Sequence, residues 1–326
     1  MENKKDSFTS ADNLPIKIFL DPEIINEFQK NKIIPIHLQL SPTNLCNLSC
    51  PWCSCANRQK TDSIDYIRLI KFIKKADELG TKAITITGGG EPVLYHHIND
   101  LIAFLGKETN IKIGLVTNGT SFSKLNKENF HYLTWCRISH GDIYVQNDNL
   151  WKSYNYAISN GPKVDWSFSY VLSEKTNEKN LKNIVTYANE HDFTHIRIVP
   201  DLYLTKKMDL EPVKKLLKNN KISDHLIIYQ SGKGYTAGQK ECYISLLKPF
   251  IASDGKIYPC CGVQYALDKN KRDFPIEMQM GDLEDFEKII KTRGIFNGSK
   301  CKFCYYNDYN WIIKRLTAPI QHKEFV

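Results

Sequence analysis

Short apolar runs, each about as long as a buried strand, recur along this chain with helical patterns between them. The strand-like runs cover residues 36–40, 83–87, 111–117, 135–139, 164–171 and 195–199. Amphipathic patterns predict helices over 64–79, 98–105, 150–158 and 181–191, the first with candidate cap residues Asp62 and Ser63 and a closing Gly80. Repeated strand–helix units predict an α/β fold with a parallel sheet and right-handed crossovers.

The loop after the first predicted strand carries three closely spaced cysteines. Cys46, Cys50 and Cys53 have the spacing C-x3-C-x2-C, and Trp52 stands directly before the third. Three thiolates can hold three corners of an iron–sulfur cluster, which normally takes four cysteines. One iron of such a cluster would stay open to another ligand.

A glycine run follows the second predicted strand, in the order Gly88, Gly89, Gly90, Glu91, Pro92. Glycines allow backbone amides and carbonyls to approach a ligand closely, and the glutamate could accept a hydrogen bond from an ammonium group. The run is not a P-loop, because no Gly-Lys-Ser/Thr sequence follows it. A tight turn with a solvated glutamate is the alternative interpretation.

Together, the cysteine triplet and the glycine run resemble the signature of radical S-adenosylmethionine (SAM) enzymes. In that family the open iron chelates the amino and carboxylate groups of SAM, and reductive cleavage gives a 5′-deoxyadenosyl radical that removes hydrogen from unactivated carbon. The resemblance implies a partial (β/α)6 TIM-like barrel, which six strand–helix units fit. It also implies that Gly88, Gly89, Gly90 and Glu91 bind the SAM amino group, that Trp52 packs near the adenine, and that Ser139 contacts SAM.

The positions of these motifs agree with a barrel. Chemistry in parallel α/β barrels sits in the loops at the C-terminal ends of the strands. The triplet, the glycine run, Asn118 and Ser139 follow or end the first four predicted strands in turn. Asn118 and Arg197 are further candidates for polar contacts to SAM or substrate, with a turn residue and a surface charge as the alternatives.

The C-terminal third carries a second set of cysteines, namely Cys242, Cys260, Cys301 and Cys304. The spacing from Cys242 through Gly255 to Cys260 resembles the opening of the SPASM and twitch extensions of the same family. No cysteine follows Cys304, so the resemblance implies a small twitch-type domain with one auxiliary [4Fe–4S] cluster, ligated on all four irons. Four thiolates would also satisfy tetrahedral zinc, which is the alternative.

Cys261 directly follows a proposed cluster ligand. Some radical SAM epimerases resemble this arrangement and use a cysteine thiol as the hydrogen donor, because the S–H bond is weak. The alternative is a second small residue after the ligand with no chemical role.

Length and composition set the remaining expectations. The 326 residues predict an N-terminal extension (1–32), a barrel (33–205), the auxiliary-cluster domain (206–310) and a C-terminal tail (311–326). No apolar signal segment or membrane-spanning run is present, so ten cysteines predict metal or redox chemistry in a reducing cytoplasm. The net charge of +8 comes mostly from lysines that are dispersed along the chain among Asp and Glu residues. Such a distribution does not favour nucleic acid as the main partner.

These observations predict a radical SAM enzyme with two [4Fe–4S] clusters that abstracts hydrogen from a C–H bond of a peptide or amino-sugar. Epimerisation with Cys261 as hydrogen donor is the favoured outcome, and a reductant such as flavodoxin or ferredoxin is the implied partner. A dehydrogenase that passes an electron to the auxiliary cluster is the first alternative. A zinc-stapled binding protein without enzymatic activity is the second.

Overall fold

The computed structural model describes residues 18–30, 32–141, 144, 146–172, 177–201, 210–219, 221–223, 225–229, 237–264, 273–301, 304 and 306–318. Six strands lie where the apolar runs predict them: β1 (His37–Leu40), β2 (Ala83–Ile86), β3 (Lys112–Thr117), β4 (Leu133–Gly141), β5 (Asp165–Leu172) and β6 (His195–Pro200). Each pairs in parallel with the next strand of the chain. The predicted α/β fold with a partial barrel is confirmed.

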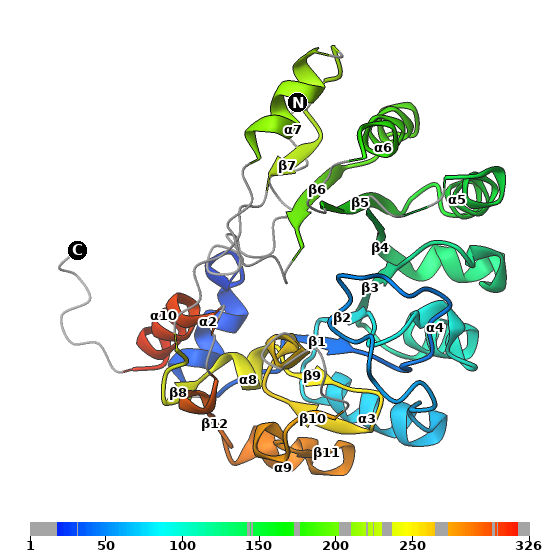
Figure 1. The fold of residues 1–326 in the computed structure, drawn as a ribbon. Helices are drawn as coiled ribbons and strands as arrows, with labels where there is room; N and C mark the ends of the chain where they lie inside the picture. The colour runs from blue at the N-terminus through cyan, green and yellow to red at the C-terminus, as the bar shows by residue number, and fades with distance from the viewer. Residues whose placement is uncertain are drawn as a thin grey trace.

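The predicted helices are also present and lie on the outer side of the curved sheet (Figure 1). They are α3 (Tyr66–Glu78), α4 (Ile98–Glu108), α5 (Asp148–Asn160) and α6 (Glu178–Glu190). The remaining helices are α2 (Pro22–Gln29), α7 (Glu211–Asn219), α8 (Ile244–Leu247), α9 (Phe286–Lys291) and α10 (Asn307–Thr317). No described helix is long and apolar enough to cross a membrane.

Four short strands that the apolar pattern does not predict extend the sheet at its two edges. They are β7 (Ile227–Tyr229), β9 (Phe250–Ile251), β10 (Lys256–Tyr258) and β11 (Gly281–Asp282); β8 (Glu241–Cys242) and β12 (Phe296–Asn297) form a separate pair. β7 pairs with β6, and β9 pairs in parallel with β1. The C-terminal region therefore continues the barrel sheet, because β10 and β11 follow β9 in antiparallel order.

The predicted domain boundaries remain predictions. The boundary between residues 205 and 206 lies outside the described residues. Helix α2 lies within the predicted N-terminal extension and touches α10 (Figure 1). Helix α10 runs across the predicted boundary at 310/311, so the first residues assigned to the tail are helical.

The start of α3 differs from the prediction. Its N-cap is Asp65, whose side chain accepts a hydrogen bond from the Arg68 amide at 2.9 Å, and not Asp62 or Ser63. Its buried face is formed by Leu69, Phe72, Ile73 and Ala76. The end is as predicted, since Gly80 follows the helix with a φ of +90° that favours glycine.

Side chains of the C-terminal region fix it to the barrel. Glu284 accepts two hydrogen bonds from the Arg68 guanidinium, both at 2.8 Å, and Phe286 packs on Phe72 with ring centroids 4.8 Å apart. The Gln264 amide donates to the Gly88 carbonyl oxygen at 3.3 Å. The second cysteine set is thus carried by a segment in direct contact with the glycine run.

Candidate active site

The cysteine triplet lies in the loop that follows β1. Cys46, Cys50 and Cys53 are free thiols, each partly buried. The loop folds back on itself, since the Cys53 amide donates to the Cys50 carbonyl at 3.0 Å and the Leu48 amide donates to the Cys46 sulfur at 3.5 Å. The structure therefore brings the three predicted ligands together at the C-terminal end of the first strand.

Burial keeps these thiols protonated when no cation is near. It raises the pKa of Cys46, and it raises that of Cys50 to about 11 with help from the other two cysteines. Thiolates are the ligands of iron, so binding of a metal cluster has to release these protons. Three adjacent cysteines without disulfides are a donor set that fits a cluster with one open iron.

Two of the three glycines after β2, Gly89 and Gly90, pack directly against the base of the cysteine loop. A Cβ on Gly89 would lie 2.0 Å from the Asn44 Oδ1, and one on Gly90 would lie 2.2 Å from the Leu45 carbonyl oxygen. The Gly90 amide donates to the Thr43 carbonyl at 3.0 Å. Only glycine allows this approach, which fixes the segment that leads into the first cysteine.

Glu91 is 2% exposed, so the alternative of a solvated turn residue is wrong. Its carboxylate accepts hydrogen bonds from the Thr117 hydroxyl at 2.5 Å, the backbone amide of Asn118 at 2.7 Å and the backbone amide of Val93 at 3.0 Å. Burial is the largest influence on its pKa and raises it, while the three donors act in the opposite direction. The carboxylate thus joins the ends of β2 and β3, and its contact with the SAM ammonium stays a prediction.

Asn118 also has polar partners within the protein. Its Nδ2 donates to the Asn47 Oδ1 at 2.9 Å, and its Oδ1 accepts from the Thr120 hydroxyl at 2.7 Å. The side chain therefore connects the end of β3 to the cysteine loop. A contact with SAM or substrate is not tested, and the observed bonds support a positioning role.

Trp52 packs over the end of β4. A Cβ on Gly141 would lie 2.5 Å from its indole ring, so only glycine fits beneath it. His140 is a buried residue of β4. The strand ends next to Asp142, which lies outside the described residues.

Ser139 and Arg197 lie in one row across three strands. Phe168 of β5 packs outward against Tyr154 of α5, with ring centroids 5.8 Å apart. Its neighbour Ser169 therefore faces the inner side of the sheet, and it pairs in register with Ser139 on β4 and Arg197 on β6. Both predicted contacts are thus on the inner face, although neither is tested as a ligand of SAM.

The second cysteine set also gathers in space. The thiols of Cys301 and Cys304 are near enough to Cys242 to influence its pKa, and those of Cys242 and Cys301 influence that of Cys260. Burial is the largest cause and raises the pKa of Cys242 to about 12 and that of Cys301 to about 11. The four predicted ligands are therefore neighbours although 62 residues separate the first from the last.

The described residues contain no group of three or more His, Cys, Asp or Glu that could hold a single metal ion. A cubane cluster does not require such a group, because each of its cysteines binds a different iron. The four thiols therefore fit a cluster by their chemistry and proximity, and metal analysis distinguishes it from zinc.

Two functional candidates have no signal in the local sequence. The Tyr144 hydroxyl is near enough to the Cys50 sulfur to act on the pKa of that thiol, which it lowers, and its ring stacks on His140 with centroids 4.5 Å apart. Lys248 is buried between α8 and β9 and is close to Cys260 and Cys261. Both owe their significance to contacts between distant segments, which no motif reveals.

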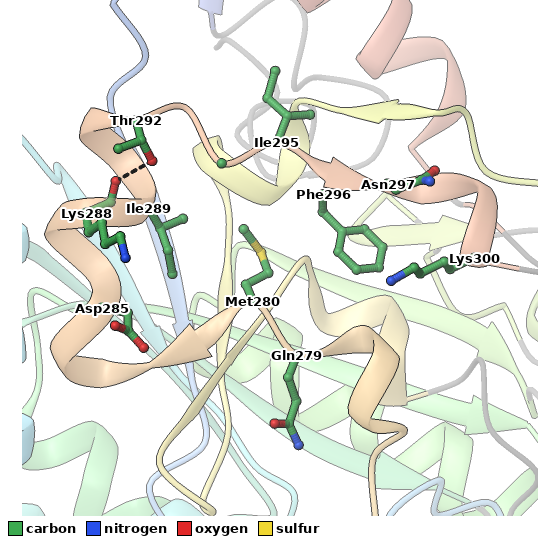
Figure 2. Close-up of a pocket in the computed structure, with 11 residues that line it drawn as sticks. Gln279, Met280, Asp285, Lys288, Ile289, Thr292, Ile295, Phe296, Asn297 and Lys300 are labelled. Atoms are coloured by element: carbon green, nitrogen blue, oxygen red, sulfur yellow. Dashed lines mark hydrogen bonds between the residues drawn. The ribbon is translucent and has the colours of Figure 1, made fainter.

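A surface hollow of about 470 Å³ lies in the C-terminal region and contains none of the predicted site residues (Figure 2). Its lining comes from the segment around β11, α9 and β12, with Met280, Ile289 and Phe296 among its apolar side chains. We assign it no part in the chemistry.

Residues 40–138 match the model of the radical SAM superfamily. The match begins in β1 and ends in β4, so it contains both the cysteine triplet and the glycine run. Residues 40–138 therefore form a radical SAM domain. Membership implies an enzyme that uses SAM and a [4Fe–4S] cluster. The second cysteine set lies outside the matched residues, so the SPASM or twitch assignment stays a prediction.

Curated relatives have several different activities. The chain is 27% identical over 200 residues to 7-carboxy-7-deazaguanine synthase from Clostridium acetobutylicum. This alignment covers 58% of this chain and 85% of the synthase. It is 30% identical over 153 residues to GTP 3′,8-cyclase from Staphylococcus aureus, covering 43% of this chain and 44% of the relative. These alignments therefore do not assign a reaction.

A solved structure shares the fold. SuiB from Streptococcus suis bound to S-adenosylmethionine superposes with a TM-score of 0.58 at 19% identity, covering 82% of this chain and 68% of SuiB. SuiB bound to the precursor peptide SuiA gives a TM-score of 0.58 at 18% identity, and the superposition covers 90% of this chain and 76% of SuiB. At these identities the likeness shows a common fold alone.

Proposed function

We propose that this radical SAM enzyme abstracts hydrogen from a C–H bond of a peptide or amino-sugar and returns hydrogen from Cys261, so that the carbon is epimerised. The observation that carries the proposal is the position of Cys261. It follows Cys260 and begins the short helix η5 (Cys261–Gln264), whose Gln264 side-chain amide donates to the Gly88 carbonyl oxygen at 3.3 Å. This supports a thiol between the second cysteine set and the substrate side of the barrel.

In this proposal the triplet Cys46, Cys50 and Cys53 holds the cluster with the open iron. Cluster and SAM, when bound, supply the 5′-deoxyadenosyl radical that removes the substrate hydrogen. The residues of the glycine run fix the cysteine loop, and Trp52 offers an aromatic surface beside it. Cys242, Cys260, Cys301 and Cys304 hold the auxiliary cluster.

Cys261 completes the reaction on the opposite face of the substrate carbon. Its S–H bond breaks, a new C–H bond forms, and the sulfur keeps one unpaired electron. One electron from a reductant of the flavodoxin or ferredoxin type and one proton from solvent restore the thiol. The substrate therefore changes configuration without net oxidation, and one SAM is consumed for each inversion.

A peptide substrate has some support from the fold. SuiB, which resembles this chain at a TM-score of 0.58, has been solved with a precursor peptide. An amino-sugar remains the other substrate class of the proposal. The competing reaction is dehydrogenation, in which the substrate radical gives its electron to the auxiliary cluster and a proton to a base.

Turnover in D2O distinguishes the two reactions, once a substrate has been found among candidate peptides and amino-sugars. Because the thiol hydrogen exchanges with solvent, epimerisation places one deuterium on the inverted carbon. The Cys261→Ala variant should cleave SAM and form the substrate radical but give no inverted product. Cys136 is a buried thiol on the outer face of β4, so the control variant Cys136→Ala should behave like wild type. A product two hydrogens lighter, without deuterium and formed equally by Cys261→Ala, would establish dehydrogenation instead.

A further inference from the structure

One row of residues crosses the four neighbouring strands β1 to β4 on the inner face of the sheet (Figure 1). The residues that pair in register are Gln39 of β1, Thr85 of β2, Gly114 of β3 and Trp135 of β4. Trp135 lies four residues before Ser139 in a regularly paired part of β4, so it shares the inner face with that serine. The leucines on either side of Gln39 are fully buried, and they face the opposite way. The side chain of Gln39 therefore points toward the inside of the barrel.

The side-chain amide of Gln39 has a buried end without a partner. Its Oε1 is buried and accepts no hydrogen bond from the residues that the structure describes. The hydroxyl that follows it in the row, that of Thr85, is instead 2.7 Å from the His37 Nε2. A buried acceptor without a donor destabilises a protein. The residue as a whole is partly exposed, so a molecule inside the barrel could reach the amide and supply the missing donor.

Gly114 makes room for an aromatic side chain in the same row. A Cβ on Gly114 would lie 2.2 Å from the Trp135 Cε2 and Cζ2 atoms, so the indole lies directly over this glycine. The Arg137 guanidinium carbon is 5.3 Å from the centroid of the indole and helps to hold it there. Trp135 is partly exposed on this face. The row thus combines an unpaired amide with an aromatic surface, which is typical of a ligand site.

This row lies close to the glycine run and to the segment of the proposed hydrogen donor. Gln39 is two residues before Ser41, about 7 Å along an extended chain. The Ser41 Oγ accepts a hydrogen bond from the Gly89 amide at 2.6 Å. The adjacent Gly88 carbonyl accepts a hydrogen bond from η5, the short helix that begins with Cys261. A substrate group held by Gln39 would therefore lie below both of these segments.

We propose that Gln39 is a substrate-binding residue whose side-chain amide pairs with a secondary amide of the substrate, beside Trp135. A primary amide has an acceptor and two donors, and a secondary amide matches it with one N–H and one carbonyl oxygen. That group occurs in a peptide bond and in an N-acetylated amino-sugar. The inference rests on the proposed function, because it takes the inner face as the substrate side. It narrows both substrate classes to molecules with an amide close to the reacting carbon.

Saturation-transfer-difference NMR measures weak binding of small probes to the anaerobically reconstituted protein, without SAM or turnover. The probes are N-acetylglycine N-methylamide, which stands for a peptide, and N-acetylglucosamine, which stands for an amino-sugar. We expect saturable binding of at least one of them. Binding of the first alone indicates a peptide substrate, binding of the second alone indicates an amino-sugar, and binding of both shows that the amide itself is recognised.

Gln39→Met keeps the length of the side chain and removes the amide, so it should weaken probe binding about tenfold or more. Without a probe, its Tm should equal or exceed that of wild type, because a buried acceptor without a partner is removed. Gln29→Met is the matched control, because Gln29 is exposed at the end of α2, and it should bind the probes as wild type does.

Absence of saturable binding of both probes to wild type, or unchanged binding to Gln39→Met, overturns the proposal. A lower Tm or a loss of iron in Gln39→Met also overturns it, because the amide would then serve the fold. None of these readouts depends on Cys261 or on SAM cleavage, so the proposed reaction and this site fail separately.

Discussion

Replacement of Glu91 by glutamine tests the observation that its carboxylate joins the segments that follow β2 and β3. The carboxylate accepts hydrogen bonds from the Thr117 hydroxyl and from the amides of Asn118 and Val93. Glutamine has the same shape, but one of its two terminal groups is a donor. If its oxygen keeps Thr117 and Val93, its NH2 group faces the Asn118 N–H, and two donors meet in a buried place.

The expected loss of stability follows from this mismatch. A buried donor without an acceptor costs about 1–3 kcal/mol, and the two remaining bonds become weaker because the acceptor is no longer charged. Burial of the charged carboxylate is unfavourable, which is why it raises the pKa of Glu91. Glutamine is neutral and avoids this cost, so part of the loss of stability is offset. We therefore expect Glu91→Gln to lower the free energy of unfolding by about 1–3 kcal/mol.

Urea unfolding followed by circular dichroism measures this change, with Glu190→Gln as a control on the exposed end of α6. The control should stay within about 0.5 kcal/mol of wild type. SAM binding by calorimetry gives the second readout, and a tenfold to hundredfold weaker affinity is expected if the carboxylate also contacts the ammonium. Wild-type stability in Glu91→Gln would refute the structural argument, whatever happens to SAM affinity.

Three further predictions concern single contacts. Tyr144→Phe removes a hydroxyl that favours negative charge on the Cys50 sulfur, so the reduction potential of the first cluster should fall; a redox titration monitored by electron paramagnetic resonance that shows no change contradicts this. Arg68→Met should lower stability at pH 7 by about 0.5–1 kcal/mol in urea, because both partners of the pair with Glu284 are largely exposed. The pair with Arg68 lowers the pKa of Glu284 to about 2. The difference in stability between Arg68→Met and wild type should therefore shrink as the pH falls from about 4.5 toward 2. A difference in stability that stays constant over this range would exclude the ion pair as its cause. Gly90→Ala should lower the free energy of unfolding by about 1–3 kcal/mol, because the added methyl group collides with the cysteine loop. A urea transition midpoint equal to that of wild type would contradict this, because the loop would then have moved aside without loss of stability.

Much of the barrel could be predicted because its strands are short, buried and rich in β-branched residues. Residues such as Ile84 and Ile113 are almost fully buried, which produces continuous apolar runs. The strands β9 and β11 have two residues each, and so short a segment has no readable period. Their pairing with the rest of the sheet arises from tertiary packing.

The cysteines of the candidate site could be found because thiols at close spacing leave a recognisable pattern. The surroundings of those thiols could not. The glycine-rich sequence predicts Glu91 to be a ligand, yet its partners are Thr117 at the end of the next strand and Asn118 directly after it. The nearness of Lys248 to Arg137 depends on how the C-terminal segment joins the barrel, which the local sequence does not encode in any motif.

The most direct test of the whole account is the metal content of the reconstituted chain. Two sets of cysteines, three in the first and four in the second, should hold two cubane clusters and therefore about eight irons and eight sulfides per chain. Replacing Cys46, Cys50 and Cys53 together by alanine should leave about half of the iron and abolish formation of 5′-deoxyadenosine from SAM. Colourless protein with zinc in both sites, or an iron content unaffected by the triple substitution, would contradict it.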